Sequence, residues 1–284
     1  MNEYRDISFN PELLKINHYQ YYPQMIPFVG KNYKETRLLV IAESHYLPPK
    51  TEDFDPEKLS NAWYEYGKNP IPEIWENNPG KTVNLKEQVD SFNSENYEKK
   101  TYPAENSWCW VDYTWTAKIV AAVDWNNGGH RIYKVLREAF KENNRKIERL
   151  EDCAFMNFFQ RPAQESGKSI VHKTKDIEVA GDTLQAVCKI LEPTKIFFVS
   201  SRAYEAFCAY INNKEHLLKW EWAKKSCQAI QMRDSFNDAI VGHSAHPGCS
   251  WWNRSSKNYT KELNGENKTG KEAFKYFISK DFKF

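Results

Sequence analysis

Four short runs of apolar residues interrupt an otherwise polar chain. They read RLLVIA at residues 37–42, CAFMNFF at 153–159, KIFFVS at 195–200 and DAIVG at 238–242. A strand that is buried on both faces of a parallel sheet has this continuous apolar composition, whereas a half-exposed strand alternates. We therefore expect these runs to be buried parallel strands.

Segments with helical periodicity lie between the runs. In residues 131–141, for example, Ile132, Val135, Leu136 and Phe140 share one side of a helix. The predicted helices are residues 111–125, 131–141, 177–191, 202–211, 216–225 and 269–279. Strands that alternate with helices predict a three-layer α/β/α sandwich with a central four-stranded parallel sheet.

The tract from about residue 47 to 110 does not follow this alternation. It is rich in Asn, Pro, Glu, Lys and Trp, and it contains at most short helices. A loop of this length inside a domain is usually functional or an insertion. We therefore expect a single α/β domain over residues 1–284, with a long insertion at about 47–110.

Composition narrows the class of protein. Hydrophobic residues make up 40% of the chain and charged residues 27%, which allows a packed core. The formal net charge is only +2, so any nucleic-acid contact must come from a local patch. Aromatic residues reach 15%, and two interpretations stay open: they pack long loops onto the core, or some form stacking surfaces for bases.

The cysteines and the terminal sequence indicate the compartment. The six cysteines include no C-x-x-C pair, which argues against a zinc ribbon or a disulfide framework and favours a reducing environment. The first residues, MNEYRDISFNPELL, lack the features of a signal peptide, and no apolar stretch approaches the roughly 20 residues that span a bilayer. We expect a cytoplasmic protein without membrane contact.

Polar segments follow three of the predicted strands. They are Glu43-Ser44-His45-Tyr46 after the first, residues 157–161 at the end of the second, and residues 243–254 after the fourth. Ligands of open α/β sheets bind beyond the carboxyl ends of the strands. These three loops are therefore the candidate binding site.

The same loops resemble the uracil-DNA glycosylase superfamily. LLVIAESHY is similar to its first motif, which reads GQDPY in one branch and GEAPG in another. FMNFFQRP is similar to the second-strand motif of the GEAPG branch, PTKIFFVSSRAYEAF to the strand and helix that follow, and GHSAHPGCSWWNR to the final HPS loop. The resemblance covers about half of the chain in four blocks, and the GEAPG branch is the nearest.

The resemblance implies roles for individual residues. Glu43 falls on the acidic position of GEAPG, where it would orient or activate the attacking water. Asn157 falls on the Asn that reads the flipped base, and His246 on the His that donates to the base carbonyl. The full set implied is Glu43 and His246 as catalytic residues, Ser44, His45, Tyr46 and Asn157 as the base-binding pocket, and Arg161, Trp251, Trp252 and Arg254 as DNA contacts.

Several positions depart from the family pattern. Ser44 stands where the GQDPY branch has its catalytic Asp, His45 replaces a Pro, and Gly248 replaces the Ser of HPS. The four iron-sulfur cysteines of the GEAPG branch have no evident counterpart, so we expect no cofactor. The aromatic residue that should stack on the base is not identified by position, and Trp63 is the candidate.

Each site residue also has a structural interpretation. Glu43 could accept backbone N–H bonds at a helix start, and Asn157 could form a buried structural hydrogen bond. His243, His246 and Cys249 are spaced like metal ligands, but a fourth ligand is not evident, so we expect no metal site.

Three functions remain open. The first is base excision from DNA, with uracil or another modified pyrimidine as the target, by base flipping and hydrolysis of the N-glycosidic bond. The second is a non-catalytic nucleic-acid or nucleotide-binding protein that keeps the glycosylase fold. The third is hydrolysis of free nucleosides or nucleotides. For the first function we expect DNA, single- or double-stranded, as the partner of a monomeric protein.

Overall fold

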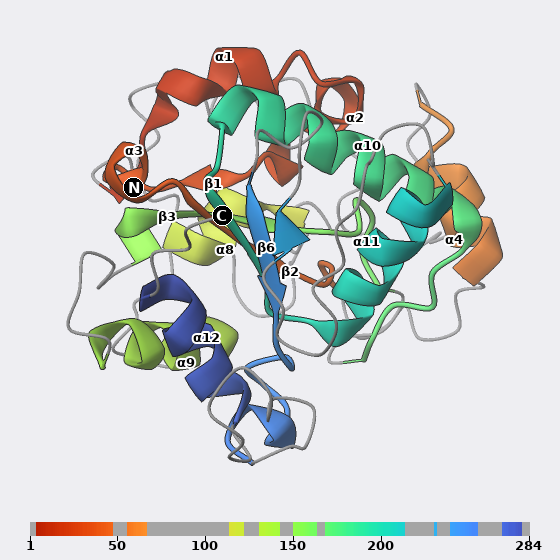
Figure 1. Cartoon of the computed structure of the whole chain (residues 1–284). Helices are drawn as coiled ribbons and strands as arrows, with labels where there is room; N and C mark the ends of the chain where they lie inside the picture. Colours follow the sequence, from red (N-terminus) through yellow and green to blue (C-terminus); the bar gives the residue numbers. More distant parts are fainter. Residues whose placement is uncertain are drawn as a thin grey trace, which may run out of the picture.

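A mixed β-sheet with helices on both faces organises the molecule (Figure 1). The computed structural model describes residues 4–47, 56–66, 114–121, 131–142, 150–163, 168–213, 230–231, 239–254 and 269–279. Within them the sheet has six strands in the order β1-β3-β2-β4-β6-β5. The strands are β1 (Phe28–Val29), β2 (Leu38–Ala42), β3 (Cys153–Asn157), β4 (Lys195–Phe198), β5 (Ile230–Gln231) and β6 (Ile240–His243).

The four predicted strands are confirmed as the parallel centre of this sheet. Strand β2 pairs in parallel with β3 and with β4, and β4 pairs in parallel with β6. Strand β3 ends at Asn157 rather than 159, because the N–H groups of Phe158 and Phe159 bond to the carbonyl oxygens of Ala42 and Glu43 beyond the ladder. The α/β class is therefore correct.

Two short edge strands make the sheet mixed rather than purely parallel. Strand β1 is antiparallel to β3, with Phe28 opposite Phe155, and β5 is antiparallel to β6, with Ile230 opposite Val241. Each contains only two residues, which is too few to show a hydrophobic period. Sequence patterns therefore could not predict them.

The helical predictions agree with the described segments. The helices of the second half are α9 (Arg131–Lys141), α10 (Thr174–Leu191), α11 (Ser201–Asn213) and α12 (Gly270–Ser279). Residues 111–125 are described only in part, where they form α8 (Thr116–Ala121). The predicted helix at 216–225 and most of the 47–110 tract lie outside the described residues.

Short elements that were not predicted cover the N-terminal part. They are η2 (Ile7–Phe9), α1 (Asn10–Leu13), α2 (Asn17–Tyr21), η3 (Pro23–Met25) and α3 (Tyr33–Thr36), and two more lie further along the chain, η5 (Leu150–Asp152) and η7 (Ser250–Trp252). Most of the helices among them have only four or five residues, so they lack a full amphipathic stripe. The helix α4 (Pro56–Trp63) is one of the short helices expected within the 47–110 tract.

Consecutive side chains of the central strands point to opposite faces of the sheet, and both faces are buried. The Phe197 ring lies 4.9 Å from Phe274 of α12, whereas the Phe198 ring lies 5.0 Å from Phe207 of α11 (centroid distances). In Figure 1, α10 and α11 accordingly cover one face and α9 and α12 the other. A Cβ atom on Gly242 would lie 2.6 Å from the Phe277 ring. The close packing of α12 on β6 therefore requires glycine at this position.

The direction in which the chain winds through the sheet reverses between β2 and β4. From β2 the chain adds β3 on one side of the sheet and then β4 on the other, so the direction of winding reverses there. Loops at such a reversal separate beyond the carboxyl ends of the strands, where open α/β sheets bind ligands. Glu43 follows β2 and Ser200 closely follows β4 at this place.

Candidate active site

Glu43 is anchored at the reversal point by two segments of the chain. Its Oε1 accepts a hydrogen bond from the Ile170 N–H at 2.9 Å, and its Oε2 accepts one from Ser200 Oγ at 2.9 Å. The Ser169 hydroxyl lies 3.5 Å from Oε2. The half-buried carboxylate is thus held in one orientation between the loop before α10 and the loop before α11.

Asn157 lies beside Glu43 at the same rim. It is the last residue of β3 and is the register partner of Ala42, which directly precedes Glu43. The residue is buried, with 8% exposure, yet its side-chain amide has no hydrogen-bond partner among the described residues. Its amide nitrogen and oxygen do not belong to the fully buried polar atoms without a partner, so they are open to solvent, and an amide offers both a donor and an acceptor to a ligand.

His246 presents one defined ring nitrogen. Its Nδ1 accepts a hydrogen bond from the Gly248 N–H at 3.0 Å, and its carbonyl oxygen accepts one from the Cys249 N–H at 2.9 Å. Because Nδ1 is an acceptor, the proton of the neutral imidazole is on Nε2. Burial lowers the pKa of His246, so the ring is neutral at physiological pH and Nε2 is a hydrogen-bond donor.

Electrostatic effects connect these groups with Tyr46. The negative charge of Glu43 opposes the lowering of the His246 pKa by burial, which indicates that the two side chains lie near one another. The same charge adds to the effect of burial in raising the pKa of Tyr46. Glu43, Tyr46 and His246 therefore share one neighbourhood, and Asn157 borders it through Ala42.

Ser44 and His45 point into the protein. His45 is buried, and its Nε2 lies 3.0 Å from Thr116 Oγ1 of α8, so this ring fastens the loop to the domain. Ser44 is also buried, and its hydroxyl has no partner among the described residues. His45 therefore stabilises the loop, and the expectation that it contacts the base is wrong.

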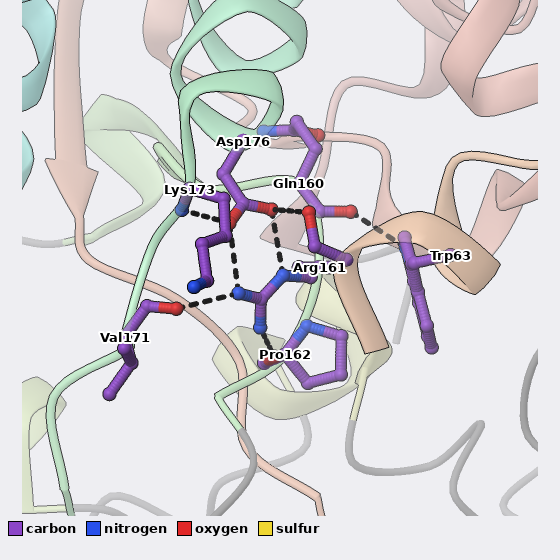
Figure 2. A network of polar contacts seen from close by, with 8 residues as sticks. Trp63, Gln160, Arg161, Pro162, Val171, Lys173 and Asp176 are labelled. Atoms are coloured by element: carbon purple, nitrogen blue, oxygen red, sulfur yellow. Dashed lines mark hydrogen bonds and ion pairs between the residues drawn. The ribbon is translucent and has the colours of Figure 1, made fainter. Parts of the chain in front are cut away.

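Arg161 requires a correction, because it is entirely buried instead of facing DNA. Its Nε and a terminal nitrogen donate to the two carboxylate oxygens of Asp176 at 2.7 and 2.8 Å, and neither side chain is exposed (Figure 2). The guanidinium also donates to the carbonyl oxygens of Pro162 and Val171. With its donors occupied inside the domain, Arg161 has no surface to offer a phosphate.

The Arg161–Asp176 pair instead supports the loop that holds Glu43. Asp176 also accepts hydrogen bonds from the Lys173 N–H at 2.7 Å and from Ser60 Oγ at 3.0 Å. Val171, whose carbonyl oxygen accepts from Arg161, directly follows Ile170, the backbone donor to Glu43. The buried pair therefore fixes the segment that orients the carboxylate.

Trp63 has a structural position rather than the stacking role considered for it. It is fully buried, its ring lies parallel to Tyr22 with centroids 4.6 Å apart, and its Nε1 donates to the Gln160 carbonyl oxygen at 2.9 Å. This contact attaches α4 to the loop after β3 (Figure 2). The aromatic residue that would stack on a base is not Trp63.

The two tryptophans after His246 have opposite environments. Trp251 is 54% exposed, and Arg254 is exposed as well. Trp252 is fully buried, and its ring packs 5.9 Å from Phe274 of α12. Trp251 and Arg254 are thus available to a partner, whereas the expected DNA contact of Trp252 is replaced by a core position.

Sequence reasoning missed three groups around Glu43. Ser200 and the Ile170 N–H contact it directly, and His172 lies close enough for the Glu43 charge to raise its pKa against the larger effect of burial. Ser200 had a sequence signal, because it ends the third apolar run at a strand's carboxyl end. A backbone N–H such as that of Ile170 has no such signal.

The described residues contain neither a cluster of metal-binding side chains nor a membrane-spanning helix. No group of three or more His, Cys, Asp or Glu side chains gathers there as a metal site would require. No helix of this part of the chain is long and apolar enough to cross a membrane.

The fold and the site define an α/β protein with a polar, His- and carboxylate-containing site at the carboxyl ends of its parallel strands. No protein-family model matches the sequence, and no curated protein matches it either. The function is therefore inferred from the geometry of the site and from the motif resemblance.

Proposed function

We propose that this protein is a DNA base-excising N-glycosylase of the uracil-DNA glycosylase type. The observation that carries the proposal is the combination of an anchored carboxylate, Glu43, with a neutral His246 donor in the same neighbourhood. The unpartnered Asn157 amide at the adjacent strand end supports it. The three loops that carry these residues are also those that resemble the superfamily's motifs.

The proposed reaction divides the work among these residues. The target nucleotide is flipped out of the stack, and Asn157 bonds the edge of its base. Glu43 positions a water molecule toward C1′ of the sugar and offsets the positive charge that develops there. As the C1′–N bond breaks, its electron pair moves onto the base, and His246 Nε2 donates a hydrogen bond to the base carbonyl oxygen. The water oxygen bonds to C1′, and the proton that this water loses ends on the nitrogen of the released base.

A neutral histidine suits this role. The Gly248 N–H occupies Nδ1, so the Nε2 proton faces away from that bond and is available to the leaving base. A preorganised donor aimed at developing negative charge needs no reorganisation during the reaction, and removing one such donor typically costs about 10²–10³ in rate.

DNA is the proposed substrate because the His246 loop continues into an exposed aromatic and an exposed cation. Trp251 and Arg254 follow His246 by five and eight positions and both face solvent. An exposed aromatic side chain can occupy the space of an extruded base, and an exposed Arg can contact phosphates.

The test is release of free base from a panel of oligonucleotides that contain uracil or other modified pyrimidines. We expect the wild-type protein to release at least one base, and Asn157→Ala and His246→Ala each to reduce the rate by about 10² or more. Glu43→Gln, which keeps the size of the side chain, should do the same. The exposed residues Asn212 and Glu178 provide matched controls, Asn212→Ala and Glu178→Gln, which should retain activity.

A second candidate function follows from the contacts that Glu43 already makes. Both of its oxygens already accept hydrogen bonds, and Ser44 stands where a related branch has a catalytic Asp. These features favour a non-catalytic nucleic-acid binder. Binding of abasic or single-stranded DNA without release of any base would support this second function and would contradict the first.

A further inference from the structure

Ser200 is the side chain outside the proposed chemistry that contacts Glu43 most closely. It is 1% exposed, lies between β4 and α11, and places its Oγ 2.9 Å from Glu43 Oε2. The same Oγ accepts a hydrogen bond from the Ala203 N–H at 3.2 Å. The hydroxyl thus joins the first turn of α11 to the carboxylate.

These two contacts determine the direction of the Ser200 proton. A hydroxyl has one proton and two lone pairs. Because the Ala203 N–H can only donate, Ser200 Oγ is the acceptor there and its single proton is directed to Glu43. Capping of the helix and orientation of the carboxylate are therefore performed by one atom.

We infer that Ser200 is a positioning residue for Glu43, an inference that rests on the proposed function. Ser200 holds Oε2 while the Ile170 N–H holds Oε1, so the plane of the carboxylate is fixed from two independent segments. A carboxylate has about four lone-pair sites. Ile170, Ser200 and the more distant Ser169 hydroxyl use up to three of them, so at least one remains to accept a water molecule. Ser200 determines the direction in which those sites point.

Loss of this orientation is expected to affect the rate more than the affinity. Glu43 acts on the water and the sugar, and a misplacement of about 1 Å in a reacting geometry can cost about 10² in rate. The contacts proposed for the base and the DNA, from Asn157 and Trp251, do not involve Ser200. A residue that only capped α11 would change stability and leave the rate of the folded protein unchanged.

Three substitutions separate these two roles. Ser200→Gly removes the donor and lowers helix stability only slightly, because glycine is tolerated at the residue that caps the N-terminus of a helix. Ser200→Asp retains an acceptor for the Ala203 N–H but places a second buried carboxylate against Glu43, so the uncharged Ser200→Gly is the main test of the lost donor. Ser200→Thr retains both contacts.

The experiment measures single-turnover base release, oligonucleotide affinity and thermal unfolding for each variant. We expect Ser200→Gly and Ser200→Asp to reduce the rate by about 10-fold to 100-fold with affinity changed less than about threefold. Ser200→Thr should restore most of the rate. In the Glu43→Gln background, Ser200→Gly should cause no further loss, because its effect acts through that carboxylate.

A matched control is available at another helix start. Thr269 Oγ1 accepts from the Glu272 N–H at 3.1 Å at the beginning of α12, and none of its hydrogen bonds involves Glu43. Thr269→Gly should therefore leave the rate unchanged. Equal rates for Ser200→Gly and wild type, or an equal loss in the Glu43→Gln background, would overturn the inference. A wild-type protein that releases no base from any substrate would instead refute the proposed function.

Discussion

Two histidines remain neutral because the protein buries them, and this has a consequence for stability. Burial lowers the pKa of His18 to about 3 and that of His243 to about 4. His18 lies among tyrosines, with Nδ1 3.2 Å from the Tyr66 hydroxyl, and His243 is stacked on Tyr204 with centroids 3.9 Å apart. Protonation of either ring would place a positive charge in an apolar environment, which is unfavourable.

The free energy of unfolding should consequently decrease as the pH is lowered below about 6.5. Below pH 6.5 the unfolded chain protonates both histidines, whereas the folded protein does not until about pH 4, so stability is complete above pH 6.5 and decreases as the pH falls. Each histidine contributes up to about 1.4 kcal/mol per pH unit. Urea unfolding between pH 7 and pH 4.5 should show a shallower decline for His18→Phe than for wild type. An unchanged slope in the variant would contradict the assignment.

The elements that meet at the active-site rim depend on one buried ion pair. Arg161 belongs to the loop after β3 and Asp176 to the first turn of α10, and both are fully buried (Figure 2). The pair also receives Ser60 of α4, so three elements converge on it. This connection keeps the Ile170 N–H in place for Glu43.

Breaking this pair should be strongly destabilising. Asp176→Asn leaves the Arg161 charge buried without its counter-charge, for which we expect a loss of about 3–5 kcal/mol in the free energy of unfolding. The exposed pair of Lys15 and Glu12 is the control, and Lys15→Ala should cost less than about 1 kcal/mol. Chemical unfolding of both variants provides the comparison. A similar small effect at both sites would mean that the buried pair contributes little to the fold.

Across the whole molecule, the candidate site residues lie at one edge of the sheet, where the parallel strands end, and the core packs against the sheet faces. Asn157 is the last residue of β3, Glu43 and Ser200 follow the carboxyl ends of β2 and β4, and His246 lies in the loop after β6. The helices α10 and α11 start from this rim, whereas the buried rings of α12 lie against the sheet face. The exposed Trp251 extends the rim into solvent.

Adjacent tryptophans allow this division to be tested. Trp252→Ala removes a fully buried ring and should cost about 3–5 kcal/mol of stability, whereas Trp251→Ala should change stability by less than about 0.5 kcal/mol. On the proposed function, Trp251→Ala should slow base release from duplex DNA more than from single-stranded DNA, because only the duplex must be held open. Equal rates on duplex DNA would argue against a wedge at this position.

Some of this site could be predicted from the chain and some could not. Glu43 and Asn157 were identified because polar residues at the carboxyl ends of apolar runs meet at one rim. Arg161 was misassigned because its partner, Asp176, lies 15 positions away on a helix, and nothing local signals that pairing. Ser200 was visible as a strand end, but its contact with Glu43 joins residues 157 positions apart.

Local sequence patterns determine the helices and strands of this protein, whereas long-range contacts determine which side chains are buried and which face the site. Continuous apolar runs are enough to indicate buried parallel strands, because such strands have no solvent face, and helical periodicity is enough to locate α9 and α10. Burial of an individual polar or aromatic side chain depends on what the rest of the chain places beside it. That is why Trp251 and Trp252, identical neighbours in the sequence, lie in solvent and in the core.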